Sequence, residues 1–102
     1  ITLGERGAAW ACRDDEGQVT SGSEEAFSVK AVDTTAAGDS FTGAFALAVA
    51  RSHGADDDPV TRTQEAVRFA SAAGALAVTR HGAQPSLPRL QEVERLMAGV
   101  QV

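Results

Sequence analysis

Apolar residues in the second half of the chain recur at helical spacing. One stripe follows the steps i, i+3, i+4, i+7 and i+8, which predicts an amphipathic helix ending at 53–54; it comprises Phe41, Ala44, Phe45, Ala48 and Val49. Asp58 and Pro59 suit the N-cap and the first turn of a second helix. The small-residue face of that second helix favours close packing and comprises Val67, Ala70, Ala73, Gly74 and Ala77. We expect Pro88 to open a last helix, whose apolar residues are Leu90, Val93, Leu96 and Met97.

The first third of the chain predicts short strands separated by turns. We expect these strands at 1–3, 8–12, 18–20 and 27–32, between glycine-rich or charged turns. Strands followed by helices, with a glycine-rich joint between them, are typical of a layered α/β fold. Such short strands are too few to cover three helices, and residue 1 is Ile rather than Met. We therefore expect the chain to be a fragment of a larger domain.

Composition narrows the classes of partner. The 102 residues carry a formal net charge of −5, from 9 Lys and Arg against 14 Asp and Glu. Nucleic acids and anionic membranes attract basic faces, so we expect neither as a partner. The single cysteine, Cys12, excludes a disulfide within the chain and a cysteine-based metal cluster. The longest apolar run, 44–50, is too short to span a bilayer, and we expect a cytoplasmic protein.

Residues 33–40, which connect the strands to the first predicted helix and are called the joint below, contain the candidate catalytic and anion-binding groups. The small residues Ala36, Ala37 and Gly38 leave the backbone amides accessible. The first amides of a helix have no partner within it and lie at the positive end of its dipole, which suits a phosphate. Asp39 beside them is well placed to take a proton from an alcohol that attacks a phosphoryl group. The residues alone equally allow Asp39 to cap the helix, and they favour an Asx turn for Asp33.

This joint and three further segments resemble the pfkB, or ribokinase-like, carbohydrate kinases. The stretch 33–41, Asp-Thr-Thr-Ala-Ala-Gly-Asp-Ser-Phe, is similar to the C-terminal signature of that family. Residues 2–7 resemble its nucleotide loop, and 65–70 resemble its penultimate helix. Residues 78–86, Val-Thr-Arg-His-Gly-Ala-Gln-Pro-Ser, are similar to a segment of ribokinases. The resemblance implies that residues 1–102 form the C-terminal, nucleotide-binding part of a three-layer α/β/α fold, with short strands followed by three helices.

The same resemblance assigns catalytic and nucleotide-binding roles. Asp39 would be the catalytic base that deprotonates the sugar hydroxyl as it attacks the γ-phosphate of ATP. The backbone amides that would form the anion hole for the transferring group are those of Ala36, Ala37, Gly38 and Asp39. The nucleotide would lie against Gly38 and along Thr2, Leu3, Gly4, Glu5, Arg6 and Gly7. Ser71 would lie near the adenine, where related enzymes carry His or Asn.

Two metal ions are also implied by the resemblance. A monovalent cation, typically K⁺, would be held by oxygen atoms, and this donor type suits such an ion better than it suits Zn²⁺. The matching positions are Asp33, Thr35, Ala77, Arg80, Gly82 and Ser86. Mg²⁺ would accompany ATP, and no residue of this chain is assigned to it.

The function predicted from the resemblance is that of an ATP-dependent sugar kinase. Ribokinase is the first choice, converting D-ribose and ATP to D-ribose 5-phosphate and ADP. Another family member stays open: a fructokinase, a ketodeoxygluconate kinase or a nucleoside kinase. A non-catalytic module that binds nucleotide or pairs with a partner also stays open, because the sugar-binding half and the lid of the family fold have no counterpart here. We expect the chain alone to be inactive and its parent enzyme to be a homodimer.

Overall fold

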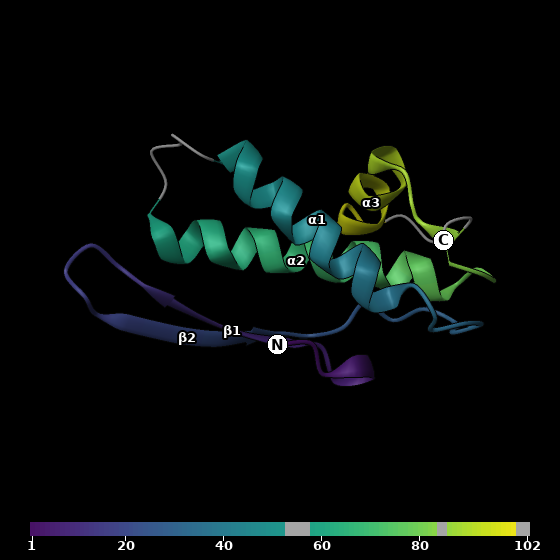
Figure 1. Cartoon of the computed structure of the whole chain (residues 1–102), viewed down its shortest axis with the longest axis horizontal. Coiled ribbons are helices and arrows are strands. Elements are labelled where there is room, and N and C mark those ends of the chain that lie inside the picture. The colour runs from purple at the N-terminus through teal and green to yellow at the C-terminus, as the bar shows by residue number, and fades with distance from the viewer. Residues whose placement is uncertain (53–57, 84–85, 100–102) are drawn as a thin grey trace.

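The computed structural model describes residues 1–52, 58–83 and 86–99. A short 3₁₀ turn and a two-stranded antiparallel hairpin come first, and three helices follow (Figure 1). The elements are η1 (Gly4–Arg6), β1 (Ala8–Arg13), β2 (Val19–Glu24), α1 (Ala37–Ser52), α2 (Pro59–Val78) and α3 (Leu90–Met97). The hairpin lies along one side of α2, while α1 and α3 pack on the other. The predicted order of strands followed by three helices is confirmed.

The hairpin is held by its turn and by one aromatic side chain. One carboxylate oxygen of Asp14, Oδ1, accepts hydrogen bonds from the amides of Glu16 and Gln18, both at 2.9 Å. Trp10 pairs with Gly22 across the strands, and a Cβ at residue 22 would lie 2.6 Å from the Trp10 ring. The strand predicted at 8–12 is confirmed. The strand predicted at 18–20 extends to residue 24, because a serine- and glycine-rich segment fits under the ring.

Two predicted strands are wrong. Residues 1–3 contribute only an isolated bridge between Thr2 and Ala8. Residues 27–32 form no strand, and the sheet of the described chain contains β1 and β2 alone. The amides of Val32 and Asp33 instead donate to the Val78 carbonyl, at 2.7 and 3.0 Å. The segment therefore runs from the hairpin to the C-terminal end of α2 without joining a sheet.

The helix starts follow local capping. The Asp58 carboxylate accepts from the Thr61 amide at 3.0 Å, and Pro59 occupies the first turn of α2, as predicted. α3 begins at Leu90 rather than at Pro88, because Arg89 is the extended N-cap and its amide donates to the Glu92 carboxylate at 2.9 Å. The helix end predicted at 53–54 lies outside the described residues, and α1 reaches Ser52.

The core lies between α2 and its neighbours and is built from small side chains. Seven buried residues of α2 contribute to it: Ala66, Val67, Ala70, Ala72, Ala73, Leu76 and Ala77. Val93 and Leu96 of α3 complete it. A Cβ at Gly74 would approach the Ala37 carbonyl to 3.4 Å, so α1 crosses α2 closely there. This crossing brings the N-terminal turn of α1 against α2.

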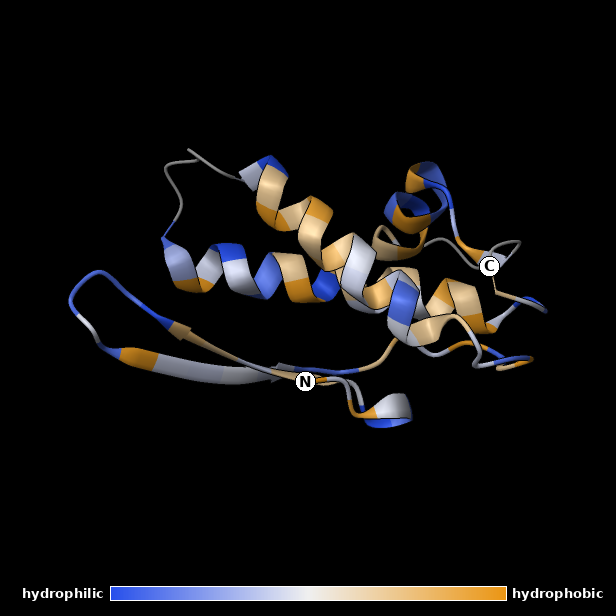
Figure 2. Cartoon of the chain, viewed as in Figure 1, coloured by the Kyte–Doolittle hydropathy of each residue, from blue (hydrophilic) through white to orange (hydrophobic). Residues whose placement is uncertain are grey.

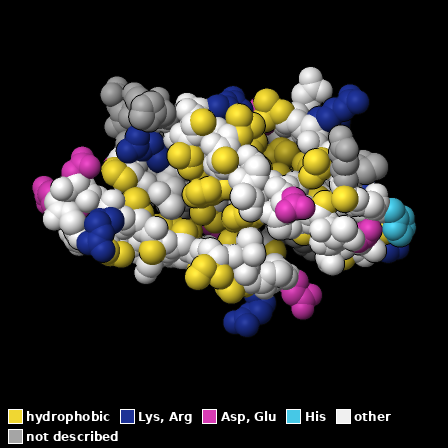
Figure 3. Space-filling model, viewed as in Figure 1, with side chains coloured by type: hydrophobic (Ala, Val, Ile, Leu, Met, Phe, Trp, Pro, Cys, Tyr) yellow, Lys and Arg dark blue, Asp and Glu magenta, His cyan; other side chains and the backbone are white. Residues whose placement is uncertain are grey.

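Part of the apolar surface of α1 remains exposed. α1 is apolar over most of its length (Figure 2), and apolar side chains gather where α1 and α2 lie on the face shown in Figure 3. Leu47 and Val49 are 45% and 47% exposed. No described helix combines the length and the hydropathy needed to cross a bilayer.

Candidate functional site

The joint at 33–40 becomes a helix through two backbone hydrogen bonds. The Ala37 amide donates to the Thr34 carbonyl at 3.2 Å, and the Ser40 amide donates to the Ala36 carbonyl at 2.9 Å. Among the described residues, the amides of Ala36, Gly38 and Asp39 have no hydrogen-bond acceptor. Three of the four predicted anion-hole positions therefore present an unpaired N–H at or just before the positive end of α1, whereas the Ala37 amide is already engaged.

Asp39 lies in the first turn of α1 with an exposed carboxylate. Within the described ranges this carboxylate accepts no hydrogen bond, so the capping role allowed by the residues is not realised. The next residue, Ser40, is only 6% exposed, and its hydroxyl donates to the Ala73 carbonyl in α2 at 3.1 Å. The turn is thus fixed to α2 through Ser40 while Asp39 stays accessible.

An apolar groove of about 250 Å³ begins beside Asp39. Its walls come from all three helices and from the segment before α3, and they include Leu47, Phe69, Leu87 and Val93. Such a wall lowers the local dielectric on one side of the carboxylate, which strengthens the electrostatic interactions of Asp39 on that side.

The Asp33 carboxylate accepts hydrogen bonds from three donors. Its Oδ1 accepts from both the amide of Thr35, at 2.9 Å, and the Thr35 hydroxyl, and its Oδ2 accepts from the Gly82 amide at 3.0 Å. The Asx turn favoured by the residues alone is therefore present, together with a partner 49 positions away. The Thr35 hydroxyl above all, and then the Gly82 and Thr35 amides, lower the pKa of Asp33 from 3.8 to about 2. The carboxylate is ionised at neutral pH.

The segment after α2 folds back on the helix end. The Arg80 amide donates to the Ala77 carbonyl at 3.3 Å, and Gly82 adopts a φ of +92°, which favours glycine. Ser86 is fully buried, and its hydroxyl donates to the Ala83 carbonyl at 2.6 Å. Residues 84 and 85, which belong to the ribokinase-like segment, lie outside the described residues.

The predicted cation ligands are brought together only in part. Hydrogen bonds join Asp33, Thr35 and Gly82, while Ala77 and Ser86 bond to other partners nearby in the chain. Carboxylate and hydroxyl oxygens such as those of Asp33 and Thr35 are hard ligands that fit a hard monovalent cation, and the groups that contact the Asp33 carboxylate in the described chain are the Thr35 amide and hydroxyl and the Gly82 amide. In the described ranges no cluster of three or more His, Cys, Asp or Glu could hold a metal ion of another kind.

The predicted nucleotide loop, Thr2–Gly7, closes on itself. The Leu3 amide donates to the Gly7 carbonyl at 2.7 Å, and the Gly7 amide donates to the Gly4 carbonyl at 3.1 Å. Glycine is required at position 7, where φ is +97° and a Cβ would lie 2.0 Å from the Glu24 carbonyl oxygen. Leu3, Glu5 and Arg6 are exposed. Ser71 lies half-buried in α2, and no hydrogen bond of the described chain joins it to this loop.

Within the described ranges, one ion pair joins residues that the sequence did not predict to be partners. Arg80, beside Gly82, pairs with Glu92 in the first turn of α3. The spacing from Arg89 to Glu92 is that of a capping box and could have indicated the local bond of Glu92. A pairing across 12 residues has no such local signal.

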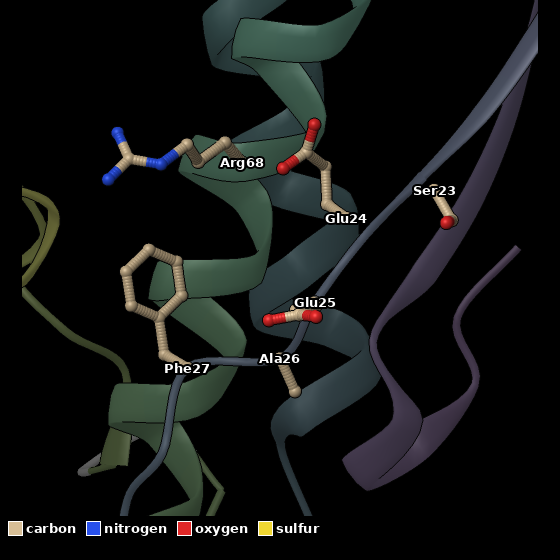
Figure 4. Close-up of a pocket in the computed structure, with 6 residues that line it drawn as sticks. All are labelled: Ser23, Glu24, Glu25, Ala26, Phe27 and Arg68. Atoms are coloured by element: carbon tan, nitrogen blue, oxygen red, sulfur yellow. The ribbon is translucent and has the colours of Figure 1, made fainter.

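A second cleft, of about 390 Å³, opens where the chain leaves the hairpin (Figure 4). Arg68 and Phe27 lie side by side there, with the guanidinium carbon 5.6 Å from the ring centroid. Arg68 also donates to the Met97 carbonyl at 3.0 Å. These contacts tie the segment after β2 and the end of α3 to α2, and the cleft lies apart from the joint.

Comparison with known proteins places the chain in a family. Residues 1–90 match the pfkB family carbohydrate kinases, and the chain belongs to that family. Fructokinase-1 of Oryza sativa subsp. japonica is 40% identical over 97 residues, which are 95% of this chain and 28% of that protein. Ribokinase of Staphylococcus aureus (strain COL) is 40% identical over 96 residues, which are 94% of this chain and 28% of that protein. The chain thus spans under a third of these relatives.

The fold agrees with this membership. The solved structure of Arabidopsis thaliana ribokinase complexed with ribose and ATP is similar with a TM-score of 0.70 and 32% identity. The match covers 95% of this chain and 28% of that one. The hairpin and three helices are therefore part of a ribokinase-like α/β fold.

Proposed function

We propose that the protein is an ATP-dependent sugar kinase in which Asp39 is the catalytic base. The observation that carries this proposal is the first turn of α1. It combines an accessible carboxylate at Asp39, amides at Gly38 and Asp39 without acceptors in the described chain, and a buried anchor at Ser40. A base beside an anion-binding helix end is the pair of groups that phosphoryl transfer to an alcohol needs.

In this proposal the reaction is a direct transfer. Asp39 takes the proton of the attacking sugar hydroxyl, whose oxygen forms a bond to the γ-phosphorus as the bond to the ADP oxygen breaks. The Gly38 and Asp39 amides and the positive end of α1 stabilise the charge on the transferring group. Removing a positioned base costs about 10²–10⁴-fold in rate, and removing one donor costs about 10²–10³-fold. ADP leaves with the electron pair of the broken bond.

The nucleotide and the metal ions are assigned to separate parts of the chain. ATP lies along Thr2–Gly7 with its adenine towards Ser71, and it arrives with Mg²⁺. The oxygens of Asp33, Thr35, Gly82 and their neighbours at 77, 80 and 86 hold K⁺, which supplies positive charge beside the anion hole when bound. Asp33 supports this assignment because its depressed pKa keeps the carboxylate anionic.

D-Ribose is the proposed acceptor, and D-fructose is the alternative. The segment 78–86 resembles ribokinases and so favours ribose. Fructokinases and ribokinases both stand among the relatives at similar identity, so sugar specificity needs a direct test. As an ATP-consuming enzyme the protein is proposed to work in the cytoplasm.

The test uses the whole protein as its gene encodes it. ADP release is measured with D-ribose, D-fructose and a nucleoside, and ATP binding is measured separately. Asp39→Asn keeps the size of the side chain and removes the base, so kcat should fall by about 10²–10⁴-fold while the Kd for ATP changes less than about twofold. Asp15→Asn, in the exposed hairpin turn, is the matched control and should leave kcat unchanged.

Each outcome distinguishes the candidates. Turnover with ribose above fructose supports a ribokinase, and the reverse order supports a fructokinase. ATP binding without turnover on any acceptor would favour the non-catalytic module. Normal turnover by Asp39→Asn would contradict the assignment of the base.

A further inference from the structure

Glu92 links α3 to the segment that follows α2. Its Oε1 accepts from Nη1 of Arg80 at 3.3 Å, and its Oε2 accepts from Nη2, so the carboxylate and the guanidinium pair through two bonds. The same Oε1 accepts from the Arg89 amide at 2.9 Å. Glu92 thus holds the start of α3 and Arg80 together.

Two carboxylate side chains hold the segment from Arg80 to Gly82, in addition to the backbone bond from the Arg80 amide to the Ala77 carbonyl. Gly82 donates its amide to Asp33, and Arg80, two residues earlier, is held by Glu92. Gly82 adopts a left-handed φ of +92°, a region that glycine enters and leaves at little steric cost. Without the Glu92 tether, this turn would keep its Arg80 amide bond to Ala77, and among the described residues the Asp33 bond would be the remaining link between Gly82 and the site.

We infer that Glu92 is a positioning residue for the proposed cation site, because through Arg80 it holds the 80–82 turn in the arrangement in which Gly82 meets Asp33. The inference rests on the proposed function, which assigns the cation to Asp33, Thr35 and this turn. It gives α3 a role outside the core: the first turn of α3 sets the cation affinity of a site formed by other elements.

The ion pair itself adds little to folding. The Arg80 and Glu92 side chains are 33% and 34% exposed, and pairs exposed to this degree contribute about 0–1 kcal/mol. Residues that orient metal ligands commonly change metal affinity by about 10–100-fold when removed. A variant at Glu92 should therefore fold and still bind the cation more weakly.

The experiment compares Glu92→Ala with Glu94→Ala in the whole protein. Glu94 is an exposed acidic residue of the same helix that forms no ion pair among the described residues, so it controls for helix and charge effects. Two quantities are measured while KCl replaces choline chloride at constant ionic strength: the rise in Tm on adding K⁺, and the K⁺ concentration that gives half-maximal ADP release. The first reports cation binding without turnover.

For Glu92→Ala we expect both K⁺ titrations to shift to about tenfold higher concentration, with kcat at saturating K⁺ within about twofold of the wild type. Glu94→Ala should titrate like the wild type. Arg80→Ala and the double variant Arg80→Ala/Glu92→Ala should shift no more than Glu92→Ala alone, because all three remove the same pair. Glu92→Gln keeps the side-chain shape, and its K⁺ titrations should shift in the same direction. This variant replaces Glu92→Ala in the experiment if Glu92→Ala is too unstable to assay.

The outcomes separate this inference from the proposed function. If the wild type turns over and responds to K⁺ but Glu92→Ala and Glu92→Gln titrate like the wild type, the positioning role is overturned while the kinase assignment stands. If the wild type turns over without any response to K⁺, the cation site and the role of Glu92 are both overturned. If K⁺ raises Tm but no sugar is phosphorylated, the proposed function fails, and the Tm titration still decides the role of Glu92.

Discussion

The two loops assigned to nucleotide binding and to catalysis are held in opposite ways. The Thr2–Gly7 loop is closed by bonds among its own residues, from Leu3 to Gly7 and from Gly7 to Gly4. The joint at 33–40 is held by partners far along the chain, since Ser40 bonds to Ala73 and Asp33 bonds to Gly82. The conformation of the Thr2–Gly7 loop is therefore set largely by its own residues. The conformation of the joint is set by α2 and by the turn that follows α2. Changes in α2 should disturb the joint and spare the nucleotide loop.

The largest expected effect is on the nucleotide loop, where Gly7 lies against Glu24 of β2. Gly7→Ala places a Cβ 2.0 Å from the Glu24 carbonyl at a φ of +97°, so the free energy of unfolding should fall by about 3 kcal/mol or more. Gly4→Ala, in the same loop at a φ of +63° and with open space around the new Cβ, should cost only about 1–2 kcal/mol. Urea unfolding of the whole protein measures both. Equal losses would show that the contact with Glu24 is not what requires glycine.

The next largest effect tests the hydrogen bond between Asp33 of the joint and the distant Gly82. Asp33→Asn removes the negative charge and one of the two acceptor oxygens that bind Thr35 and Gly82, so the K⁺ concentration for half-maximal activity should rise on the order of 10–100-fold. Asp14→Asn is the matched control, because Asp14 also accepts two amide hydrogen bonds in a turn but lies in the hairpin. A similar change in both variants would contradict a specific role for Asp33.

A smaller effect compares two serines of the same helix. Ser40→Ala removes the bond to Ala73 across the α1–α2 interface, which should lower the free energy of unfolding by about 1 kcal/mol and kcat by up to about fivefold. Ser52 bonds within its own helix, to the Val49 carbonyl at 2.9 Å, and Ser52→Ala should leave kcat unchanged. Urea unfolding and ADP release are measured on both variants. An unchanged kcat in Ser40→Ala would show that Asp39 does not depend on this anchor.

The smallest effect concerns the start of α2 and its pH dependence. The Thr61 amide, and then the Thr61 hydroxyl, lower the pKa of Asp58 below 3.8. A carboxylate whose folded-state pKa is depressed stabilises the fold above its unfolded pKa, and this stabilisation is lost as the pH falls through the folded value. Asp58→Asn keeps a neutral capping oxygen, so its Tm should fall less steeply than that of the wild type below pH 3.8. Parallel Tm curves would contradict this account.

Much of the fold could be predicted from the chain because its signals are local. The apolar stripe from Phe41 to Val49, the Asp58-Pro59 start and the 8–12 strand each depend on residues a few positions apart. The strand predicted at 27–32 is wrong because the end of this segment bonds to the Val78 carbonyl of α2 instead of to a strand, and no pattern within the segment reports which partner it meets. The prediction that Pro88 opens the last helix is wrong by two residues, because the bond from the Arg89 amide to Glu92 places the start of α3 at Leu90.

By itself the sequence determined the chemistry of the joint: small residues before a helix, a carboxylate at its first turn, and an Asx turn at Asp33. These features depend on side-chain size and on bonds between near neighbours. Only the tertiary structure decided that Asp33 also meets Gly82, that Ser40 bonds to Ala73, and that Glu92 holds Arg80. Such partners lie 12 to 49 positions apart and carry no periodic signal. The crossing of α1 over α2 and the return of the chain after α2 bring them together.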